Sequence, residues 1–295
     1  MNRRSFLRTS AAALAVASLA PSVFAAKPRE LKRAIMWSTV GVKGSVLDKM
    51  KLVKEAGFAG VEPMGAMNRE EVIAGLKETG LKAASVCCHT HWAKPLSAPD
   101  EATRKIGLDG LILSLQDAQA YGATSVLLVP GVAKNGVSYD DCFKRSVAEI
   151  KKAIPAAKDT GVKIAIENVW NDFITTPQQA VEFLDAINSE WVGWHFDIGN
   201  VGRYSPAEQW IPVIGKRILK LHIKEFNTKN MTPENPGKGF GSKFLEGTNN
   251  WPAIMKALDD VGYTSPDNWA TIEMGGGDLN RMKTLNGQLD QILSS

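Results

Sequence analysis

The chain has 295 residues, of which 44% are hydrophobic and 22% charged, and it contains 26 glycines and 14 prolines. This composition is that of a globular protein and excludes a collagen-like, disordered or disulfide-scaffold chain. Three of the 35 basic residues lie in the first ten positions, and beyond residue 25 there remain 32 basic against 31 acidic residues. A body so close to neutral lacks the clustered lysine and arginine that nucleic-acid binding requires, so no nucleic-acid partner is expected.

The N-terminus has the pattern of an export signal. A twin-arginine pair, Arg3 and Arg4, precedes an apolar run of small residues at 11–20 and then a Val-Phe-Ala that suits a signal peptidase. The apolar run is too short to span a bilayer. We predict a twin-arginine signal peptide at 1–26 and a single domain at 27–295, which is periplasmic or otherwise exported and has no membrane attachment after cleavage. A chance basic start or an uncleaved anchor is the alternative.

Short apolar or β-branched runs alternate with longer stretches of helical periodicity along the whole mature chain. The predicted strands are 33–37, 60–62, 83–88, 125–129, 163–167, 193–197, 218–224 and 269–273. The predicted helices are 45–56, 69–79, 103–121, 139–159, 176–187, 251–261 and 279–293. This alternation predicts a parallel sheet covered by helices.

Glycines stop several of the predicted helices just before the next strand. They are Gly57, Gly80, Gly122, Gly161 and Gly262. Eight strand–helix units with such stops predict an α/β fold of the (β/α)8 TIM barrel type. A doubly wound open sheet competes with it, but such a sheet normally carries a glycine-rich phosphate turn after its first strand, and the sequence there is Trp-Ser-Thr-Val-Gly.

Polar residues stand at the ends of four neighbouring predicted strands, where the functional residues of a barrel gather. The fifth, sixth and eighth strands end in Glu167, Asp197 and Glu273, and the seventh carries His222. Three buried carboxylates repel one another unless a cation compensates them. Taken singly, each residue could instead cap a helix or pair with a lysine. Together they predict one divalent ion, first Mn²⁺, with Mg²⁺, Co²⁺ and Zn²⁺ also compatible with this donor set.

The motifs around these residues have a characteristic order and spacing. They are Glu-Asn-Val-Trp-Asn at 167–171, His-Phe-Asp-Ile-Gly-Asn-Val at 195–201 and His-Ile-Lys-Glu-Phe at 222–226. In these motifs the chain resembles the sugar epimerase and isomerase branch of the xylose isomerase-like TIM barrels. Within that branch it is most similar to the relatives of L-ribulose-5-phosphate 3-epimerase and D-tagatose 3-epimerase.

The resemblance implies a metal held by Glu167, Asp197, His222 and Glu273. It also implies that Glu167 and Glu273 are the acid and the base. In such enzymes a ketose chelates the metal, one glutamate removes the proton next to the carbonyl to give a cis-enediolate, and the other returns a proton on the opposite face. The implied activity is that of a metal-dependent sugar epimerase or isomerase.

Further residues are assigned to the substrate with less sequence support. These residues are Glu62, His89, Asn200, Lys224, Trp37 and Trp170. His89 is preferred to His91, which also follows the third predicted strand and is expected to face the same end of the barrel. Lys224 could bind a substrate oxygen or hold a carboxylate ligand, and each tryptophan could stack on a sugar or only pack. His195 is expected one layer below Asp197, beside the ligands.

Asn200 departs from the tagatose-epimerase pattern, which often has His three residues after the strand-six aspartate. The Asp-x-Gly-Asn form resembles instead the phosphopentulose epimerases. Phosphorylated sugars are cytoplasmic metabolites, whereas the leader predicts export. We therefore expect an unphosphorylated ketose, or an oxidised glycoside such as a 3-keto sugar.

Other functions remain open at this point. The barrel could bind a carbohydrate, or serve as a partner subunit, without turnover, although a pure binder has no need of the opposed Glu167 and Glu273. The same metal site could also serve a keto-glycoside lyase or a dehydratase. Endonuclease IV shares the barrel, but a resemblance to it would imply a three-metal site with many histidine ligands. This chain has four His in all. The sequence is compatible with a homo-oligomer.

The segment 226–250 is long, follows the seventh predicted strand and is rich in Gly, Asn, Pro and Lys. A loop of that length in a compact domain is usually functional. We predict that it is a lid or a binding loop.

Overall fold

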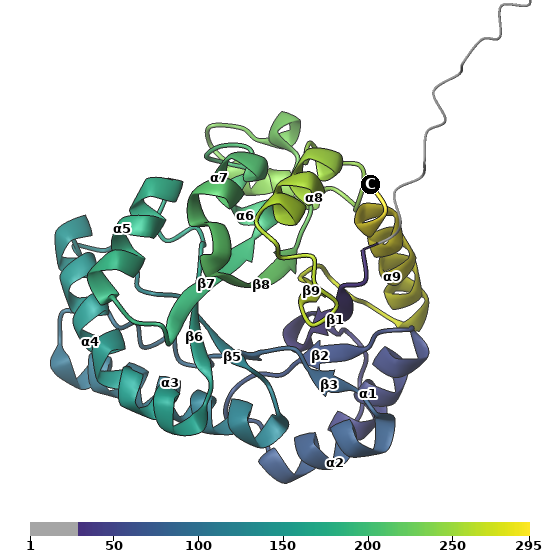
Figure 1. Cartoon of the computed structure of the whole chain (residues 1–295), viewed down its shortest axis with the longest axis horizontal. Helices are drawn as coiled ribbons and strands as arrows, with labels where there is room; N and C mark the ends of the chain where they lie inside the picture. Colours follow the sequence, from purple (N-terminus) through teal and green to yellow (C-terminus); the bar gives the residue numbers. More distant parts are fainter. Residues whose placement is uncertain (1–28) are drawn as a thin grey trace, which may run out of the picture.

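Parallel strands form one sheet that curls into a barrel, with helices around its outside (Figure 1). The computed structural model describes residues 29–295, so the predicted signal peptide at 1–26 lies outside the described residues. Among residues 29–295, no helix combines the length and the apolar character that crossing a membrane requires. The curled parallel sheet with helices around it confirms the predicted barrel for the part of the chain that the structure describes.

The sheet has the order β3-β2-β1-β9-β8-β7-β6-β5-β4, and every neighbouring pair is parallel. Its strands are β1 (Lys32–Met36), β2 (Gly60–Glu62), β3 (Lys82–Ala83), β4 (Val86–Cys87), β5 (Ser125–Leu128), β6 (Lys163–Glu167), β7 (Val192–Asp197), β8 (Ile218–Ile223) and β9 (Trp269–Ile272). Pairing of β1 with β9 joins the beginning and the end of the described chain.

The third predicted strand is interrupted, which is why nine strands occupy eight positions of the barrel. Strand β3 pairs with β2 and β4 pairs with β5, and Ala84 and Ser85 lie between them. Just beyond β2, Met64 forms an isolated bridge with Cys87, and the backbone N–H of Cys87 donates to Pro63 at 2.9 Å. The barrel is nearly closed through this interruption.

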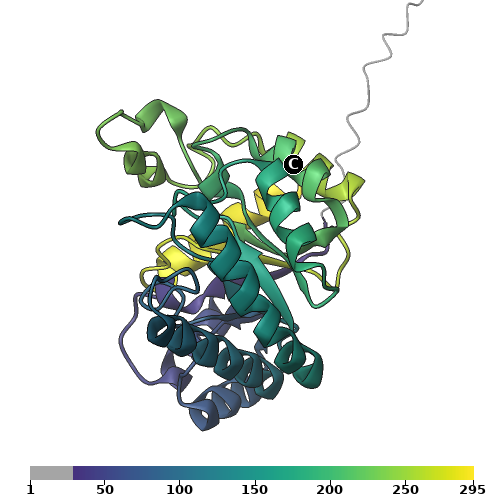
Figure 2. The same ribbon diagram turned by 90° about the vertical axis from the view of Figure 1, so that its left-hand side faces the viewer.

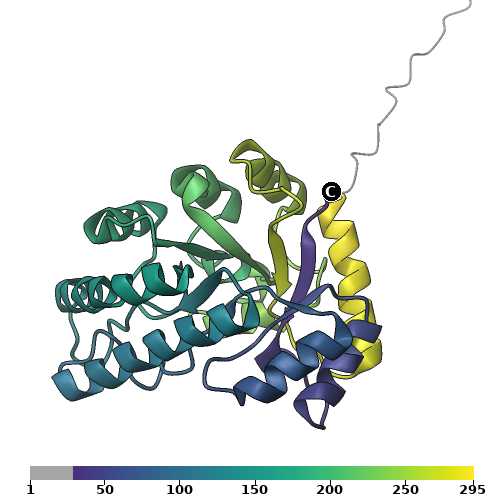
Figure 3. The same cartoon turned by 60° about the horizontal axis from the view of Figure 1, so that its bottom comes forward.

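The helices surround the strands (Figure 3). They are α1 (Val46–Glu55), α2 (Arg69–Thr79), α3 (Glu101–Tyr121), α4 (Tyr139–Thr160), α5 (Pro177–Ile187), α6 (Ile198–Val201), α7 (Ala207–Ile214), α8 (Trp251–Asp260) and α9 (Leu279–Leu293). All seven predicted helices are confirmed to within two residues at each end. Helices α6 and α7 were not predicted, because α6 has a single turn and α7 is short and contains Pro212.

The predicted glycine stops are confirmed by their backbone geometry. Gly80, Gly122 and Gly161 are the C-caps of α2, α3 and α4, with φ of 70°, 73° and 69°. Gly57 and Gly262 also have positive φ, 90° and 78°. A side chain would strain the chain in this left-handed conformation, so glycine ends the helix and turns the backbone toward the next strand.

The segment between β8 and α8 stands out from the barrel at one end (Figure 2). The buried Glu225 anchors it, because its carboxylate accepts hydrogen bonds from the backbone of Leu245 at 2.9 Å and from the indole of Trp251 at 3.1 Å. A Cβ on Gly247 would lie 2.1 Å from this carboxylate, so the close approach requires glycine. The anchored segment places Phe240 beside the cavity described below.

Candidate metal centre

Four side chains from adjacent strands converge at the carboxyl-terminal end of the barrel. Glu167 ends β6, Asp197 ends β7, His222 lies on β8, and Glu273 follows β9 directly. Each offers one ligand atom, and these atoms all lie within 4.8 Å of one another. The parallel register produces this convergence, since Asp197 lies opposite His222 across β7 and β8. The structure thus brings together the four residues predicted as metal ligands.

The three carboxylates surround one nitrogen of His222. Its Nδ1 lies 3.1 Å from Glu167 Oε1, 3.1 Å from Glu273 Oε2 and 3.8 Å from Asp197 Oδ2. Asp197 Oδ1 accepts the backbone N–H of Asn200 at 2.7 Å, whereas the buried Oδ2 has no hydrogen-bond partner among the described residues. A buried carboxylate oxygen without a donor is costly, and a cation beside it would remove that cost. The donor set therefore fits a divalent ion.

The other nitrogen of His222 faces a fully buried carboxylate. Its Nε2 lies 3.1 Å from Glu62 Oε2, which also accepts a hydrogen bond from Ser85 Oγ at 2.9 Å. The ring of His195 stands edge-on to that of His222, with centroids 4.2 Å apart. A carboxylate on the far nitrogen fixes the orientation of an imidazole and raises its basicity as a ligand. Glu62 thus lies below His222, outside the cavity lining, and His195 lies beside the ligands as expected.

Burial and mutual charge set the protonation of the cluster. Burial raises the pKa of Glu167 and holds that of Asp197 well above its usual range. Burial also acts to raise the pKa of Glu273, but hydrogen bonding to His222 and the charge of Lys224 outweigh it and hold the pKa well below its usual value. For His222, burial acts to lower the pKa, but the neighbouring carboxylates raise it well above the ordinary value. Glu167, Asp197 and His222 thus take up protons more readily than they would in water, as expected where several carboxylates share one buried site, and the site favours added positive charge.

Lys224 is the protein's own cation at this cluster. Its Nζ lies 2.9 Å from Glu273 Oε2 and 3.7 Å from Asp197 Oδ2, and it donates to Asn200 Oδ1 at 3.4 Å. Burial acts to lower the pKa of Lys224, but the carboxylates, Asp197 first, raise it above its ordinary value. Of its two predicted roles, the geometry fits the one in which it holds carboxylates in position.

Asn168 ties the ends of β6 and β7 together. Its Oδ1 accepts the Trp194 indole at 3.0 Å and the backbone N–H of Asp197 at 3.1 Å, while its amide donates to the Asp197 carbonyl at 2.8 Å. The Asn200 side chain donates to the carbonyl of Asn168 at 3.0 Å. These bonds fix the backbone on both sides of the candidate ligands.

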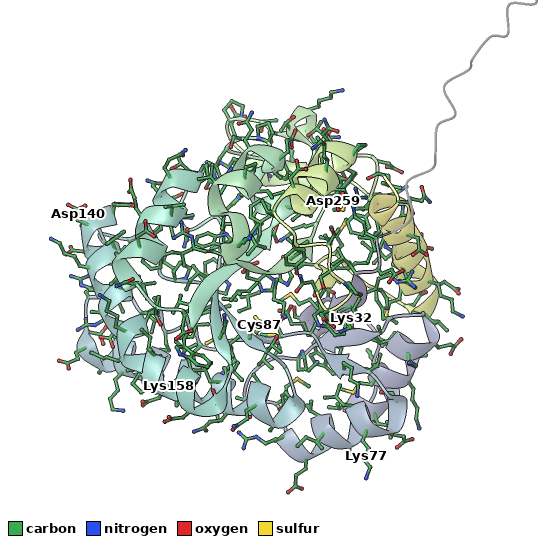
Figure 4. All side chains as sticks on the ribbon, in the orientation of Figure 1. Lys32, Lys77, Cys87, Asp140, Lys158 and Asp259 are labelled. Carbon is green, nitrogen blue, oxygen red and sulfur yellow. The ribbon has the colours of Figure 1, made fainter. Side chains whose placement is uncertain are left out.

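A cavity of about 240 Å³ opens above the cluster. Glu167 and Glu273 line it, together with three of the predicted substrate residues, Trp170, Asn200 and Lys224. Figure 4 shows a further lining residue, Cys87, near the middle of the barrel in that view.

The other predicted substrate residues lie elsewhere. Trp37 is half-buried under the ammonium group of Lys49, which lies 5.4 Å from its ring centroid, and Trp37 is outside the cavity lining. His89 is exposed and also outside the lining, whereas His91 is buried and lines the cavity. Of the two histidines expected to face the mouth, the structure places His91, and not His89, in the cavity lining.

Sequence reasoning missed several residues of the cavity wall. Trp92 and Phe240 line it, but Trp92 lies in a turn and Phe240 in the short 3-10 helix Pro236–Gly241, where no sequence periodicity reveals the side-chain direction. His91 carried a signal, a histidine just after a strand, which spacing alone could not separate from that of His89. Ser85, which supports Glu62, lies in the interruption between β3 and β4 and carried no signal.

The fold and the site together define a class of protein. It is a (β/α)8 barrel with a cluster of candidate metal ligands at the carboxyl ends of its strands. The chain belongs to the xylose isomerase-like TIM barrel family, whose model matches residues 50–291. The family resemblance predicted from the three motifs is confirmed.

The chain is similar to several sugar epimerases among curated proteins and solved structures. L-ribulose-5-phosphate 3-epimerase UlaE of Salmonella paratyphi A is 24% identical over 234 residues, which cover 75% of this chain and 80% of that protein. The structure of D-psicose 3-epimerase in the presence of D-fructose has a TM-score of 0.73 and 17% identity, covering 90% of this chain and all (100%) of that one. The 3-keto-D-glucoside 4-epimerase YcjR of E. coli has a TM-score of 0.71 and 18% identity, covering 89% and 98%.

Proposed function

We propose that the protein is a divalent-metal-dependent sugar epimerase or isomerase that moves a proton on a carbon next to a ketose carbonyl. The observation that carries the proposal is the convergence of Glu167, Asp197, His222 and Glu273 within 4.8 Å. The two glutamates also line the cavity, from β6 and from the end of β9, with two strands between them. The epimerases among the relatives support the same class of reaction.

In this proposal the two glutamates perform the proton transfer. One carboxylate removes the proton from the carbon beside the carbonyl, and the carboxylic acid of the other returns a proton to the opposite face of that carbon, which inverts it. An isomerase would return the proton to the adjacent carbon instead. Lys224, 2.9 Å from Glu273 Oε2, holds that carboxylate in place.

The ion would be held by Glu167, Asp197, His222 and Glu273, and when bound it supplies the Lewis acidity that polarises a sugar carbonyl. Mn²⁺ is proposed first, because three carboxylates with one imidazole form an oxygen-rich donor set. Mg²⁺, Co²⁺ and Zn²⁺ are the alternatives that the test must include.

We also propose that the mature protein works outside the cytoplasm on an unphosphorylated ketose or a 3-keto sugar. The support is the twin-arginine pattern at Arg3 and Arg4 and the small-residue apolar run after it. Recovery from the periplasmic fraction with an N-terminus near residue 27 is expected. Recovery of the intact chain from the cytoplasm would contradict this part of the proposal.

The experiment is metal analysis of the mature protein purified without chelator, followed by solvent proton exchange in D₂O with free ketoses, ketose phosphates and 3-keto glycosides. About one divalent ion per chain and exchange on one substrate class are expected. The variant Glu273→Gln should slow exchange at least 100-fold, the scale of a lost general acid or base.

The outcomes separate the competing functions. A metal-loaded Glu273→Gln variant that exchanges as fast as the parent would rule out the proposed proton transfer. Product analysis separates an epimer or isomer from the shorter products of a lyase or dehydratase. Sugar binding with no exchange after Mn²⁺ addition would favour a binding protein.

A further inference from the structure

His91 is held in the cavity wall in one tautomeric form. It is 6% exposed, and the backbone N–H of Val129, just beyond β5, donates to its Nδ1 at 3.1 Å. A ring nitrogen that accepts a hydrogen bond carries no proton, so the neutral imidazole must carry its proton on Nε2. That Nε2 has no hydrogen-bond partner within residues 29–295, and the ring lines the cavity that Glu167 and Glu273 also line.

The imidazole stays neutral at physiological pH. Burial, with a smaller contribution from the charge of His89, lowers the pKa of His91 to about 3. The neutral ring therefore offers a single fixed donor, Nε2–H, and no positive charge. Such a donor suits a hydroxyl or carbonyl oxygen better than a phosphate, which proteins usually bind with cationic groups.

Aromatic side chains make up much of the wall around this donor. Trp92 follows His91 directly, is 52% exposed and stands edge-on to it, with ring centroids 5.9 Å apart. Phe240 and Trp170 line the same cavity, with ring centroids 4.8 Å apart. An exposed indole at the edge of a polar site offers an apolar face with one polar edge, a combination suited to the mixed surface of a sugar.

The described part of the cavity wall has no basic side chain that is free to bind a phosphate. Within residues 29–295, Lys224 is the one lysine or arginine in the lining, and its ammonium group is ion-paired with Glu273 at 2.9 Å. Arg203 lies outside the lining, with its guanidinium over the rings of Trp170 and Tyr204 at 4.9 and 5.5 Å. A phosphate beside His91 and Trp92 would lose its water without gaining a positively charged side chain as a partner.

We propose that His91 and Trp92 form a subsite for an uncharged, hydroxylated part of the substrate. In it, His91 Nε2–H donates to a sugar oxygen and Trp92 covers the adjoining apolar face. This inference rests on the proposed function and specifies its substrate class as a free ketose or keto-glycoside. The two side chains of the subsite carry no positive charge to pair with a sugar phosphate.

The two ring nitrogens of His91 can be tested separately by substitution. His91→Asn keeps an acceptor near the Nδ1 position for the Val129 N–H and removes the donor to the cavity. His91→Gln places an amide donor near the Nε2 position. His89→Leu is the matched control, because this neighbouring histidine is exposed and outside the cavity lining.

The measurement is isothermal titration calorimetry of the metal-loaded protein with D-psicose, L-ribulose and L-ribulose 5-phosphate. His91→Asn should weaken binding of a free ketose about tenfold, the scale of one lost hydrogen bond. His91→Gln should restore most of that loss, Trp92→Leu should weaken binding several-fold, and His89→Leu should match the parent. L-ribulose 5-phosphate should bind no more tightly than L-ribulose.

Three results would overturn the subsite: equal affinities for the parent and His91→Asn, tighter binding of the phosphate by tenfold or more, or no binding of any free sugar by the parent. The failures can also be told apart. If binding depends on His91 but no sugar exchanges its proton, the proposed catalysis fails and the subsite stands. If exchange occurs but sugar binding is insensitive to His91, the catalysis stands and the subsite fails.

Discussion

The two ring nitrogens of His222 face two different environments. On the Nδ1 side lie three carboxylates and Lys224; Glu167, Glu273 and Lys224 line the cavity, and the Glu273 side chain is 22% exposed. On the Nε2 side lie Glu62 and His195, both with no exposed surface. Each side brings together at least three potential ligand atoms within 4.8 Å, yet only the first can be reached from the cavity.

This difference separates a binding role from a supporting one. The Nδ1 side has three carboxylates, and two of them, those of Glu167 and Glu273, line the cavity. Buried atoms without a hydrogen-bond partner among residues 29–295 occur on both sides, Asp197 Oδ2 on the first and Glu62 Oε1 on the second, so the number of carboxylates and their access to the cavity distinguish the two sides. On the Nε2 side, Glu62 Oε2 already contacts His222 and Ser85, which fixes the ring. An imidazole ligand needs such a partner on its far nitrogen to keep its tautomer and direction. We therefore place the ion on the Nδ1 side and the orienting carboxylate on the other.

The largest expected effect comes from Asp197→Asn. Its amide oxygen can still accept the Asn200 N–H, now made at 2.7 Å, so the local backbone should hold while one anionic ligand is lost. Metal affinity should fall more than 100-fold, beyond the range observed for groups that only support ligands. Competition with a chromophoric chelator measures this affinity. An unchanged affinity would show that the ion does not use this carboxylate.

Glu62→Gln should have the next largest effect. It removes the negative charge from the Nε2 side of His222 but keeps the shape, so metal affinity should fall 10- to 100-fold with the fold retained. The same competition assay, together with circular dichroism, measures both properties. A loss as large as that of Asp197→Asn would instead make Glu62 a ligand.

Thr271→Val is a matched control for the barrel interior. Thr271 lies two residues before Glu273, and its buried hydroxyl has no hydrogen-bond partner among the described residues. Replacing it with an apolar group of the same shape should leave metal affinity unchanged. Any loss comparable to that of Glu62→Gln would mean that general perturbation of the interior, rather than orientation of His222, explains the effect.

An effect smaller than that of Glu62→Gln should come from Ser85→Ala. It deletes the hydroxyl that donates to Glu62 Oε2 at 2.9 Å, one step further from the candidate ligands. The loss of about 1 kcal/mol expected for one hydrogen bond corresponds to a melting temperature lower by about 2–4 °C. Metal affinity should change no more than about threefold. A change equal to that of Glu62→Gln would mean that the hydroxyl, and not the carboxylate alone, sets the ring orientation.

Much of the fold could be predicted because its signals are local and repeated. The strands that end in Glu167 and Asp197 are rich in buried apolar residues, and glycines such as Gly122 end helices in a conformation that other residues resist. The candidate ligands followed from the rule that the carboxyl ends of barrel strands meet at one face. The short helix α7, with its internal Pro212, lacked such a signal.

The remaining features depend on three-dimensional placement. The position of Glu62 at a strand end predicted that it is near the site, but not that it lies beneath His222, since that depends on depth within the barrel. The choice between His89 and His91 depends on the path of a turn, and the position of Phe240 depends on the anchoring of a long segment by Glu225. No periodicity encodes these contacts.

The most direct test of the central claim is anomalous diffraction from crystals of the Mn²⁺-loaded protein. The account predicts one strong peak at bonding distance from His222 Nδ1, with Glu167, Asp197 and Glu273 as the other protein ligands. A peak at His222 Nε2 between Glu62 and His195, or no peak at His222 in metal-saturated crystals, would contradict it.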